Sequence, residues 1–197
     1  MGSIVGKVAP SITKMIRADH ASVLATFHQY QVDTAASTKQ ALVETACTAL
    51  EVHAQLEEEI FYPALRRVAG DNSVLAKSVP EHDDMRHLIA RLRRMSSADS
   101  AYDLTFMALM RDVLHHVADE ETVVLPEAER LLGDDLGRLG ARMTRRRAEL
   151  MGPRVGRMVL QKARVAPVRS ALLATGIVLG AGYLVRRTLR SRRFWSI

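Results

Sequence analysis

The chain has 197 residues, of which 48% are hydrophobic and 5% aromatic, and it contains a single cysteine, Cys47. One cysteine excludes a disulfide framework and a thiolate metal site, and it favours a reducing compartment inside the cell. The net charge of +6 is divided unevenly, because residues 1–141 hold 14 basic and 21 acidic side chains, whereas residues 142–197 hold 14 basic and one acidic. We therefore expect an acidic body followed by a basic extension.

Glycine, proline and short polar segments divide the acidic body into long helical stretches. Pro63 is expected to kink the second stretch near its end, and Pro80 to disturb the first turns of the third. No segment alternates apolar and polar residues in the manner of a strand. Short connections between four helices predict an all-α, up-down-up-down four-helix bundle. The expected helices cover residues 11–32, 38–68, 74–95 and 102–132.

The basic extension is predicted to begin with a fifth helix, from Asp134 to Leu150, which ends before Gly152-Pro153. An apolar run of fifteen residues, 171–185, follows between flanking arginines. At about 1.5 Å per residue this run is short for a membrane span, but the cations around it suit an anionic membrane surface. A helix that covers the bundle and an oligomer contact stay open as alternatives, while a nucleic-acid arm does not account for the apolar run. The predicted domains are 1–135, 136–166 and 167–197.

Two repeated phrases organise the histidines, all seven of which lie in the acidic body. One phrase begins at His53 and the other at His116, and in both a glutamate follows by four positions and a proline by ten. Each phrase also has a histidine upstream at nearly the same distance: His20 precedes His53 by 33 positions, and His82 precedes His116 by 34. The chain therefore resembles two helical hairpins that carry equivalent residues.

This spacing is suited to binding metal ions. At about 100° per residue, positions i and i+4 lie one turn apart on the same helix face, so His53 and Glu57 can chelate one ion, as can His116 and Glu120. Imidazole nitrogen with carboxylate oxygen suits iron, manganese or zinc. Four imidazoles and two carboxylates exceed the needs of one tetrahedral zinc, and they match two ions bridged by carboxylates and an oxygen species from solvent.

On these residues the chain resembles the hemerythrin-type HHE cation-binding domain over about residues 10–135. The resemblance implies a four-helix bundle with a non-haem di-iron centre, oxo- or hydroxo-bridged, that binds or reacts with oxygen species. Glu57 and Glu120 would bridge two iron ions and the imidazoles would cap them. The implied metal ligands are His20, His53, Glu57, His82, His116 and Glu120.

One position departs from the oxygen-carrying hemerythrins, which have a fifth histidine one turn after the third-helix ligand. Arg86 occupies that place here, and His87 lies about 140° around the helix from His82. The departure favours peroxide chemistry or sensing over reversible oxygen carriage. His87, His28 and His115 stay open as additional ligands, and His116 is preferred to His115 because it matches the repeat. Glu58, Glu59 and Glu121 are expected to be solvated or to support the ligands, with a bridging role as the alternative. Tyr62 is expected to be a packing residue, with a phenolate ligand as the alternative.

The sequence thus predicts a di-iron protein that binds or senses dioxygen or reactive oxygen species such as hydrogen peroxide. Two alternatives remain: a peroxide-decomposing, catalase-like enzyme, and a metal-stabilised interaction module associated with a membrane. We expect a cytoplasmic protein, attached to the inner face of the membrane if the tail binds anionic lipid. Nucleic acid is not an expected partner, and the sequence does not determine the oligomeric state.

Overall fold

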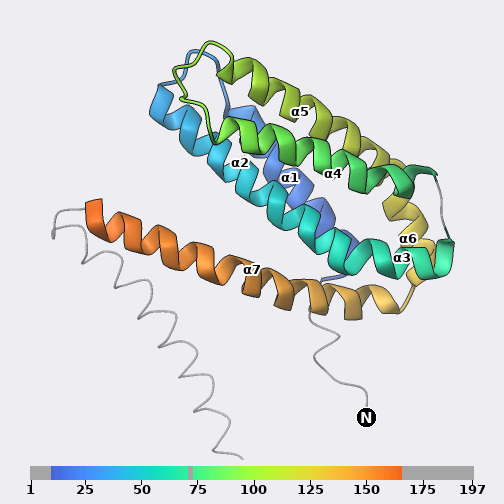
Figure 1. Cartoon of the computed structure of the whole chain (residues 1–197). Coiled ribbons are helices and arrows are strands. Elements are labelled where there is room, and N and C mark those ends of the chain that lie inside the picture. The colour runs from blue at the N-terminus through green and yellow to red at the C-terminus, as the bar shows by residue number, and fades with distance from the viewer. Residues whose placement is uncertain (1–9, 71–72, 166–197) are drawn as a thin grey trace, which may run out of the picture. The chain divides into compact units, whose positions relative to one another are not determined.

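The computed structural model describes residues 10–70 and 73–165, and this part of the chain is all-helical (Figure 1), as predicted. Two short elements, η2 and η3, are π-helical turns, in which the backbone bonds span five residues instead of four. In chain order the elements are α1 (Ile12–Gln29), α2 (Ala36–Leu56), η2 (Glu57–Phe61), α3 (Tyr62–Ala69), α4 (Ser73–Leu92), α5 (Tyr102–Asp119), η3 (Glu120–Val124), α6 (Leu125–Leu132) and α7 (Asp135–Val165).

The first six helices form four rods that pack side by side. The first rod is α1, the second is α2 continued through η2 into α3, the third is α4, and the fourth is α5 continued through η3 into α6. Within each hairpin α1 packs on α2 and α4 on α5, and the hairpins meet through α2 with α4 and α3 with α6 (Figure 1). This packing concerns the compact unit that ends at Leu150; a second unit begins at Met151.

Local sequence explains where the rods begin and end. Ser11 precedes α1, and its hydroxyl accepts a hydrogen bond from the backbone N–H of Lys14 at 3.3 Å, which satisfies one free donor of the first turn. The second and fourth rods end at Gly70 and Gly133, whose φ angles of 69° and 41° lie in the left-handed region that favours glycine. Both glycines stand where the sequence predicted the helices to end.

A π-helical turn precedes each of the two phrase-ending prolines, and the expected kink at Pro63 stays a prediction. In each phrase the departure from α-helical geometry lies in the turn before the proline, at η2 before Pro63 and at η3 before Pro126. Proline has no N–H to give to the carbonyl four residues back, and the wider turn before it lets the helix continue. Pro80 lies inside α4, which remains helical from Ser73 to Leu92.

A large apolar core fills the half of the bundle near the α1–α2 and α4–α5 connections. It draws on α1, α2, α4 and α5, and its ring pair Phe27–Phe106 meets edge to face with centroids 5.6 Å apart. Burial of this many apolar side chains provides a rigid base for the polar cluster beside it. The core consists of Val23, Phe27, Val43, Ala46, Cys47, Leu50, Met85, Ile89, Leu92, Tyr102, Phe106, Leu109 and Val113.

The fifth helix, α7, is longer than predicted. It runs from Asp135 to Val165 and passes through Gly152-Pro153, before which the helix was predicted to end. That expectation was wrong: a proline removes one backbone hydrogen bond of a helix, and the helix continues beyond it to Val165. The predicted apolar tail, 167–197, lies outside the described residues, and the boundaries of the three predicted domains stay predictions. Among the described helices, none combines the length and apolar character needed to cross a bilayer.

Candidate metal centre

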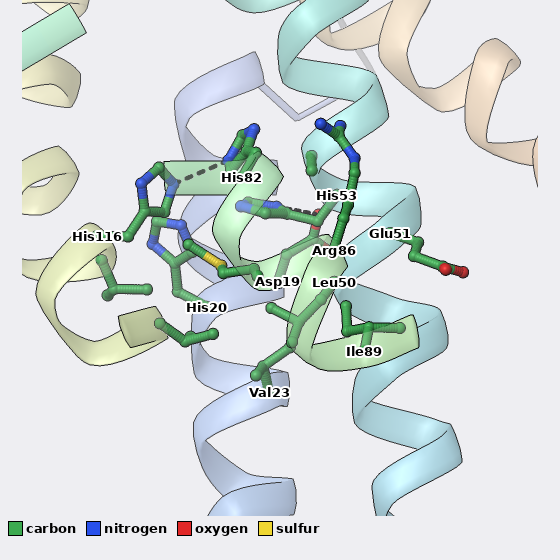
Figure 2. Close-up of a pocket in the computed structure, with 14 residues that line it drawn as sticks. Asp19, His20, Val23, Leu50, Glu51, His53, His82, Arg86, Ile89 and His116 are labelled. Atoms are coloured by element: carbon green, nitrogen blue, oxygen red, sulfur yellow. Dashed lines mark hydrogen bonds and ion pairs between the residues drawn. The ribbon is translucent and has the colours of Figure 1, made fainter. Parts of the chain in front are cut away.

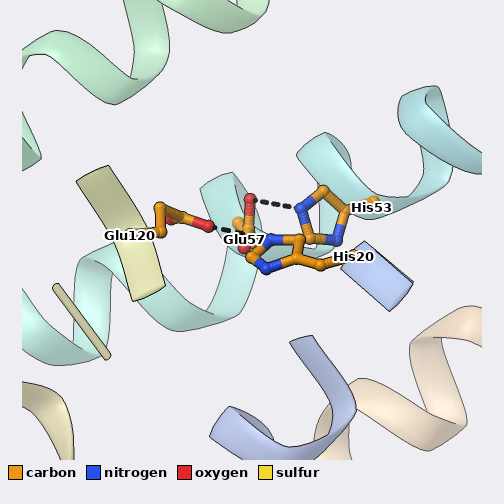
Figure 3. A group of neighbouring side chains, drawn as sticks. All are labelled: His20, His53, Glu57 and Glu120. Atoms are coloured by element: carbon orange, nitrogen blue, oxygen red, sulfur yellow. Dashed lines mark ion pairs between the residues drawn. The ribbon is translucent and has the colours of Figure 1, made fainter. Parts of the chain in front are cut away.

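All six predicted ligands are buried where the four rods meet. Their exposed fractions run from 0% at Glu57 to 6% at His53, although glutamate is almost never fully buried unless it is paired. Their ligand atoms form two groups, each with atoms within 4.8 Å of one another. His20, His53, Glu57 and Glu120 form the first group (Figure 3), and Glu57, His82 and His116 form the second.

Each glutamate lies between one histidine of the first hairpin and one of the second. Oε2 of Glu57 is 3.2 Å from Nε2 of His53 and 3.4 Å from Nε2 of His82. Oε2 of Glu120 is 3.2 Å from Nε2 of His20 and 3.6 Å from Nε2 of His116. Both carboxylates therefore face the two pairs of imidazoles at once, which is the placement that a bridging carboxylate needs.

Both of these glutamates lie at the start of a π-helical turn. Glu57 is the first residue of η2 and Glu120 the first of η3, and in each case the residue five positions on donates its N–H to the glutamate carbonyl. Single π turns inside α-helices occur frequently at functional sites, because the extra residue alters the direction of the side chains. The His-x-x-x-Glu pairs thus lie at the junction between regular and widened helix.

Several nitrogen and oxygen atoms of the cluster that could bind a metal ion lack the hydrogen bonds that buried polar atoms normally make. Nε2 of His20 and of His53, Oε1 of Glu57 and Oε2 of Glu120 have no hydrogen-bond partner among the described residues. An unsatisfied polar atom costs about 1–3 kcal/mol in a protein interior. Nitrogen and oxygen lone pairs converging on one point are the donor set of iron, manganese or zinc, so the residues fit a metal centre.

The charges of the cluster also fit a metal centre. Burial, followed by the negative charge of Glu120, raises the pKa of Glu57 well above its usual range. Burial lowers the pKa of His20, but its interaction with the carboxylate of Glu120 and its hydrogen bond to Glu121 outweigh burial and raise that pKa to about 9. Two buried carboxylates this close require compensating positive charge, which metal cations would supply.

A carboxylate contacts each of the four histidines on the side of the ring that faces away from the cluster. Their Nδ1 atoms contact a carboxylate oxygen, leaving Nε2 directed into the cluster, and this arrangement fixes the ring orientation of a metal-binding histidine. Every one of these acids is the direct neighbour in sequence of a predicted ligand on another helix. The pairs are His20–Glu121 at 2.8 Å, His53–Asp19 at 3.3 Å, His82–Glu58 at 2.8 Å and His116–Glu81 at 2.8 Å.

Tyr62 was predicted to be a packing residue, but its phenol belongs to the cluster. Its side chain is fully buried, and its phenol oxygen lies 2.9 Å from Oε1 of Glu120 and 3.1 Å from Oε2 of Glu57. Burial and the two carboxylates raise its pKa well above the usual range, so the phenol keeps its proton. One signal was available: Tyr62 follows Glu57 by five residues, and Leu125 takes the equivalent place in the other phrase.

The remaining histidines near the predicted ligands lie apart from both groups. His28, His87 and His115 are exposed, and neither group of candidate ligands in the described chain includes them. Arg86, at the position of the fifth histidine in oxygen carriers, instead bonds Glu58 at 2.6 Å and Asp83 at 2.7 Å. No fifth imidazole therefore faces the cluster from the described part of α4.

A small cavity adjoins the histidines on the side of the apolar core (Figure 2). Its volume is about 20 Å³, and about 10–15 Å³ is enough for one water-sized molecule. His20, His53, His82 and His116 line one side, and Arg86 also contributes to the wall. The other side is apolar, with Val23, Leu50, Met85, Ile89, Val113 and Val117.

The fold and the cluster define a class: an all-helical protein with a buried histidine–carboxylate cation site. The hemerythrin HHE cation-binding domain model matches residues 11–128, which is more than half of the chain, so the protein belongs to that family. Among curated proteins, no sequence matches this chain. The fold is similar to a crystal structure of a hemerythrin HHE cation binding domain-containing protein from Mycobacterium kansasii, with 19% identity and a TM-score of 0.63. The similarity covers 79% of this chain and 93% of the other.

Proposed function

We propose that this protein holds two iron ions in the cluster and binds dioxygen or a reactive oxygen species beside them. The observation that supports the proposal most strongly is the position of the cavity. It has room for one small molecule, four imidazoles border it, and its far wall is apolar. An uncharged diatomic molecule or a peroxide fits such a space, whereas a larger organic substrate does not.

The proposed ligand assignment follows the hairpins. His20 and His53 would hold one ion, His82 and His116 the other, and Glu57 and Glu120 would lie between them, as their distances to both histidine pairs suggest. When bound, a pair of irons would supply exchange of two electrons with the oxygen species. Six nitrogen and oxygen donors exceed the four that one closed zinc site takes, so they favour two ions. Iron is preferred over zinc for these ions because zinc has no redox chemistry with which to exchange electrons with an oxygen species.

The surrounding side chains have separate tasks in this proposal. The apolar residues of the cavity exclude water, which strengthens the electrostatic interactions inside the site. The carboxylates behind the histidines hold each Nδ1–H, so that Nε2 stays free to bind metal. Tyr62, with its proton held beside Glu57 and Glu120, can donate a hydrogen bond to whichever carboxylate oxygen carries more negative charge.

The second candidate function is decomposition of hydrogen peroxide, in which two molecules of peroxide give two of water and one of dioxygen. Arg86 is the observation that favours it, because the residue at that position faces Glu58 and Asp83 and adds no imidazole to the cluster. The family resemblance then implies one exchangeable position more than an oxygen carrier has. The other alternative, a metal-stabilised interaction module associated with a membrane, predicts a metal site that is inert toward oxygen and peroxide.

Metal analysis combined with an optical spectrum tests the proposal. Protein produced with iron should contain about two irons per chain and absorb in the near ultraviolet through ferric charge transfer, and addition of peroxide should change the spectrum. Release of dioxygen during that addition distinguishes turnover from binding. One zinc per chain, or a complete lack of metal, contradicts the proposal. Bound iron whose spectrum ignores both dioxygen and peroxide supports the interaction module instead.

A further inference from the structure

The helix α7 packs closely against the beginning of α1. A Cβ atom added at Gly140 would lie 2.0 Å from the carbonyl oxygen of Pro10 and 3.1 Å from the backbone N of Ile12. Only glycine permits this approach of one backbone to another. Leu139 and Met143, on the same side of α7, are each 1% exposed. The helix α7 therefore comes close to the chain at the start of α1.

The contact continues along both helices in register. One turn after Gly140, the hydroxyl of Thr144 lies 3.4 Å from the sulfur of Met15. One further turn along, both Nη atoms of Arg147 bind the carboxylate of Asp19, at 2.6 Å and 2.5 Å. Since Gly140 and Arg147 are seven residues apart, they face the same side of the helix. The close packing at Gly140 thus places the guanidinium of Arg147 beside the carboxylate of Asp19.

Asp19 connects this ion pair to the metal centre. Its Oδ2 accepts from Nδ1 of His53 at 3.3 Å and also binds Arg147, so the three side chains form a chain from α7 to a predicted ligand. Asp19 is 17% exposed and Arg147 32% exposed, so this pair lies partly within the protein and solvent screens it less than a surface pair. A two-pronged guanidinium fixes both the position and the plane of a carboxylate.

The same arrangement occurs at two other histidines. Arg17 binds Glu121, the partner of His20, at 3.0 Å. Arg86 binds Glu58, the partner of His82, at 2.6 Å. Both of these arginines lie within residues 11–128, the part that matches the family model, whereas Arg147 lies outside it. The family match therefore includes Asp19, which contacts His53, but not the arginine that binds Asp19.

We propose that Arg147 is a positioning residue for the metal centre: through Asp19 it holds the imidazole of His53 with Nε2 directed at the site, so that α7 is part of the centre. This inference rests on the proposal that the cluster binds metal. It gives the first turns of α7 a role beyond covering the bundle. Loss of the α7 contact would loosen one ligand of the His20–His53 pair and leave the His82–His116 pair unchanged.

The variant Arg147→Ala tests the inference, and Arg146→Ala is its matched control. Arg146 is the preceding residue on α7 and has the same charge, and it binds Glu59 at 2.7 Å and Glu149 at 3.1 Å, neither of which contacts a histidine. The first readout is NMR of metal-free protein labelled with ¹⁵N-histidine. In Arg147→Ala the Nδ1 proton of His53 should exchange faster with water and the other ring tautomer should appear, while Arg146→Ala should match wild type.

The second readout is competition for iron with a strong chelator. Loss of a group that supports a metal-binding histidine typically weakens metal affinity about 10- to 100-fold. In Arg147→Ala we expect one of the two irons to bind more weakly by this factor, and in Arg146→Ala we expect both irons to bind as in wild type. In Arg147→Lys the affinity should recover in part, because the lysine ammonium reaches a carboxylate without the two-pronged geometry. If Arg147→Ala does not fold, Arg147→Lys supplies both readouts.

The outcomes separate this inference from the proposed function. If wild-type protein binds two irons and Arg147→Ala behaves like Arg146→Ala in both readouts, the positioning role is wrong while the metal centre stands. If wild-type protein binds no iron or other metal, the proposed function fails, and the NMR comparison still decides whether Arg147 orients His53. Equal weakening of both irons in Arg147→Ala would also overturn the inference, because it indicates a general loosening of the bundle.

Discussion

The phenol oxygen of Tyr62 lies 2.9 Å from Oε1 of Glu120, a residue 58 positions away in sequence on the opposite hairpin. The same oxygen lies 3.1 Å from Oε2 of Glu57. A single proton therefore serves two buried carboxylates that both face the histidines. This contact joins the second and fourth rods at the centre of the cluster, and it gives Tyr62 a direct influence on both proposed bridging groups.

Replacing Tyr62 by phenylalanine should leave the fold and the two irons in place. The ring still fills its space, and loss of a hydrogen bond of this kind costs about 0.5–1.5 kcal/mol. The ferric absorption and the rate of reaction with peroxide should change, because the carboxylates lose their proton donor. Stopped-flow absorption measures both. Tyr30→Phe, which removes a hydrogen bond to Asp103 far from the cluster, is the control and should react like wild type.

The two glutamates, Glu57 and Glu120, should differ in how much iron the protein loses when each is replaced by alanine. Glu57 belongs to both groups of candidate ligands, whereas Glu120 belongs to the first group alone. Glu57→Ala should therefore lose most of the iron, and Glu120→Ala should keep about one iron, held by the second group. Iron content per chain, measured after gel filtration, checks this. His28→Ala, at an exposed position, should keep both irons; equal iron loss in the two glutamate variants would show that the groups are not distinct.

Substitution of Gly140 by alanine should destabilise the protein. The added methyl group would lie 2.0 Å from the Pro10 carbonyl oxygen, and backbone shifts of this kind cost about 1–3 kcal/mol. Each kcal/mol lowers Tm by about 2–4 °C in a chain of this size. Gly152→Ala is the matched control on the same helix, because nothing lies within 4 Å of its added Cβ. In thermal denaturation that control should unfold at or slightly above the Tm of wild type, because alanine stabilises a helix interior relative to glycine by about 0.5–1 kcal/mol.

The thiol of Cys47 should be unreactive in the folded protein. Burial raises its pKa from 9.0 to about 12, and its side chain is fully buried, so neither thiolate nor access is available for alkylation. Iodoacetamide at pH 8 should label denatured protein rapidly and native protein slowly. Between pH 9 and about 12 the unfolded thiol ionises while the folded one does not, so this group lowers stability as pH rises through that window.

The basic tail gives a prediction that depends on sequence alone. If residues 167–197 bind an anionic membrane surface, full-length protein should sediment with vesicles that contain anionic phospholipid, and a chain truncated after Leu150 should not. High salt should release an interfacial attachment, because ions screen charges over about 8–10 Å at physiological strength, and should barely affect a spanning helix. Full-length protein that ignores such vesicles would leave the tail as a packing or assembly element.

The sequence by itself determined the helical fold and the six candidate ligands. Helical periodicity depends on neighbours three and four residues apart, so the rods and their ends at Gly70 and Gly133 could be predicted locally. The repeat of His-x-x-x-Glu places each pair on one helix face without knowledge of the packing. The family resemblance then ordered the two hairpins around one centre.

The tertiary structure decided which side chains surround those ligands, because such contacts join residues distant in sequence. Asp19 follows no spacing rule that links it to His53, 34 positions on, and Tyr62 reaches Glu120 only because α3 packs on α6. The support of His53 by Arg147 depends in addition on the close approach of α7 at Gly140. This contact could not be predicted, because a helix follows from its own residues but the neighbour against which it packs does not.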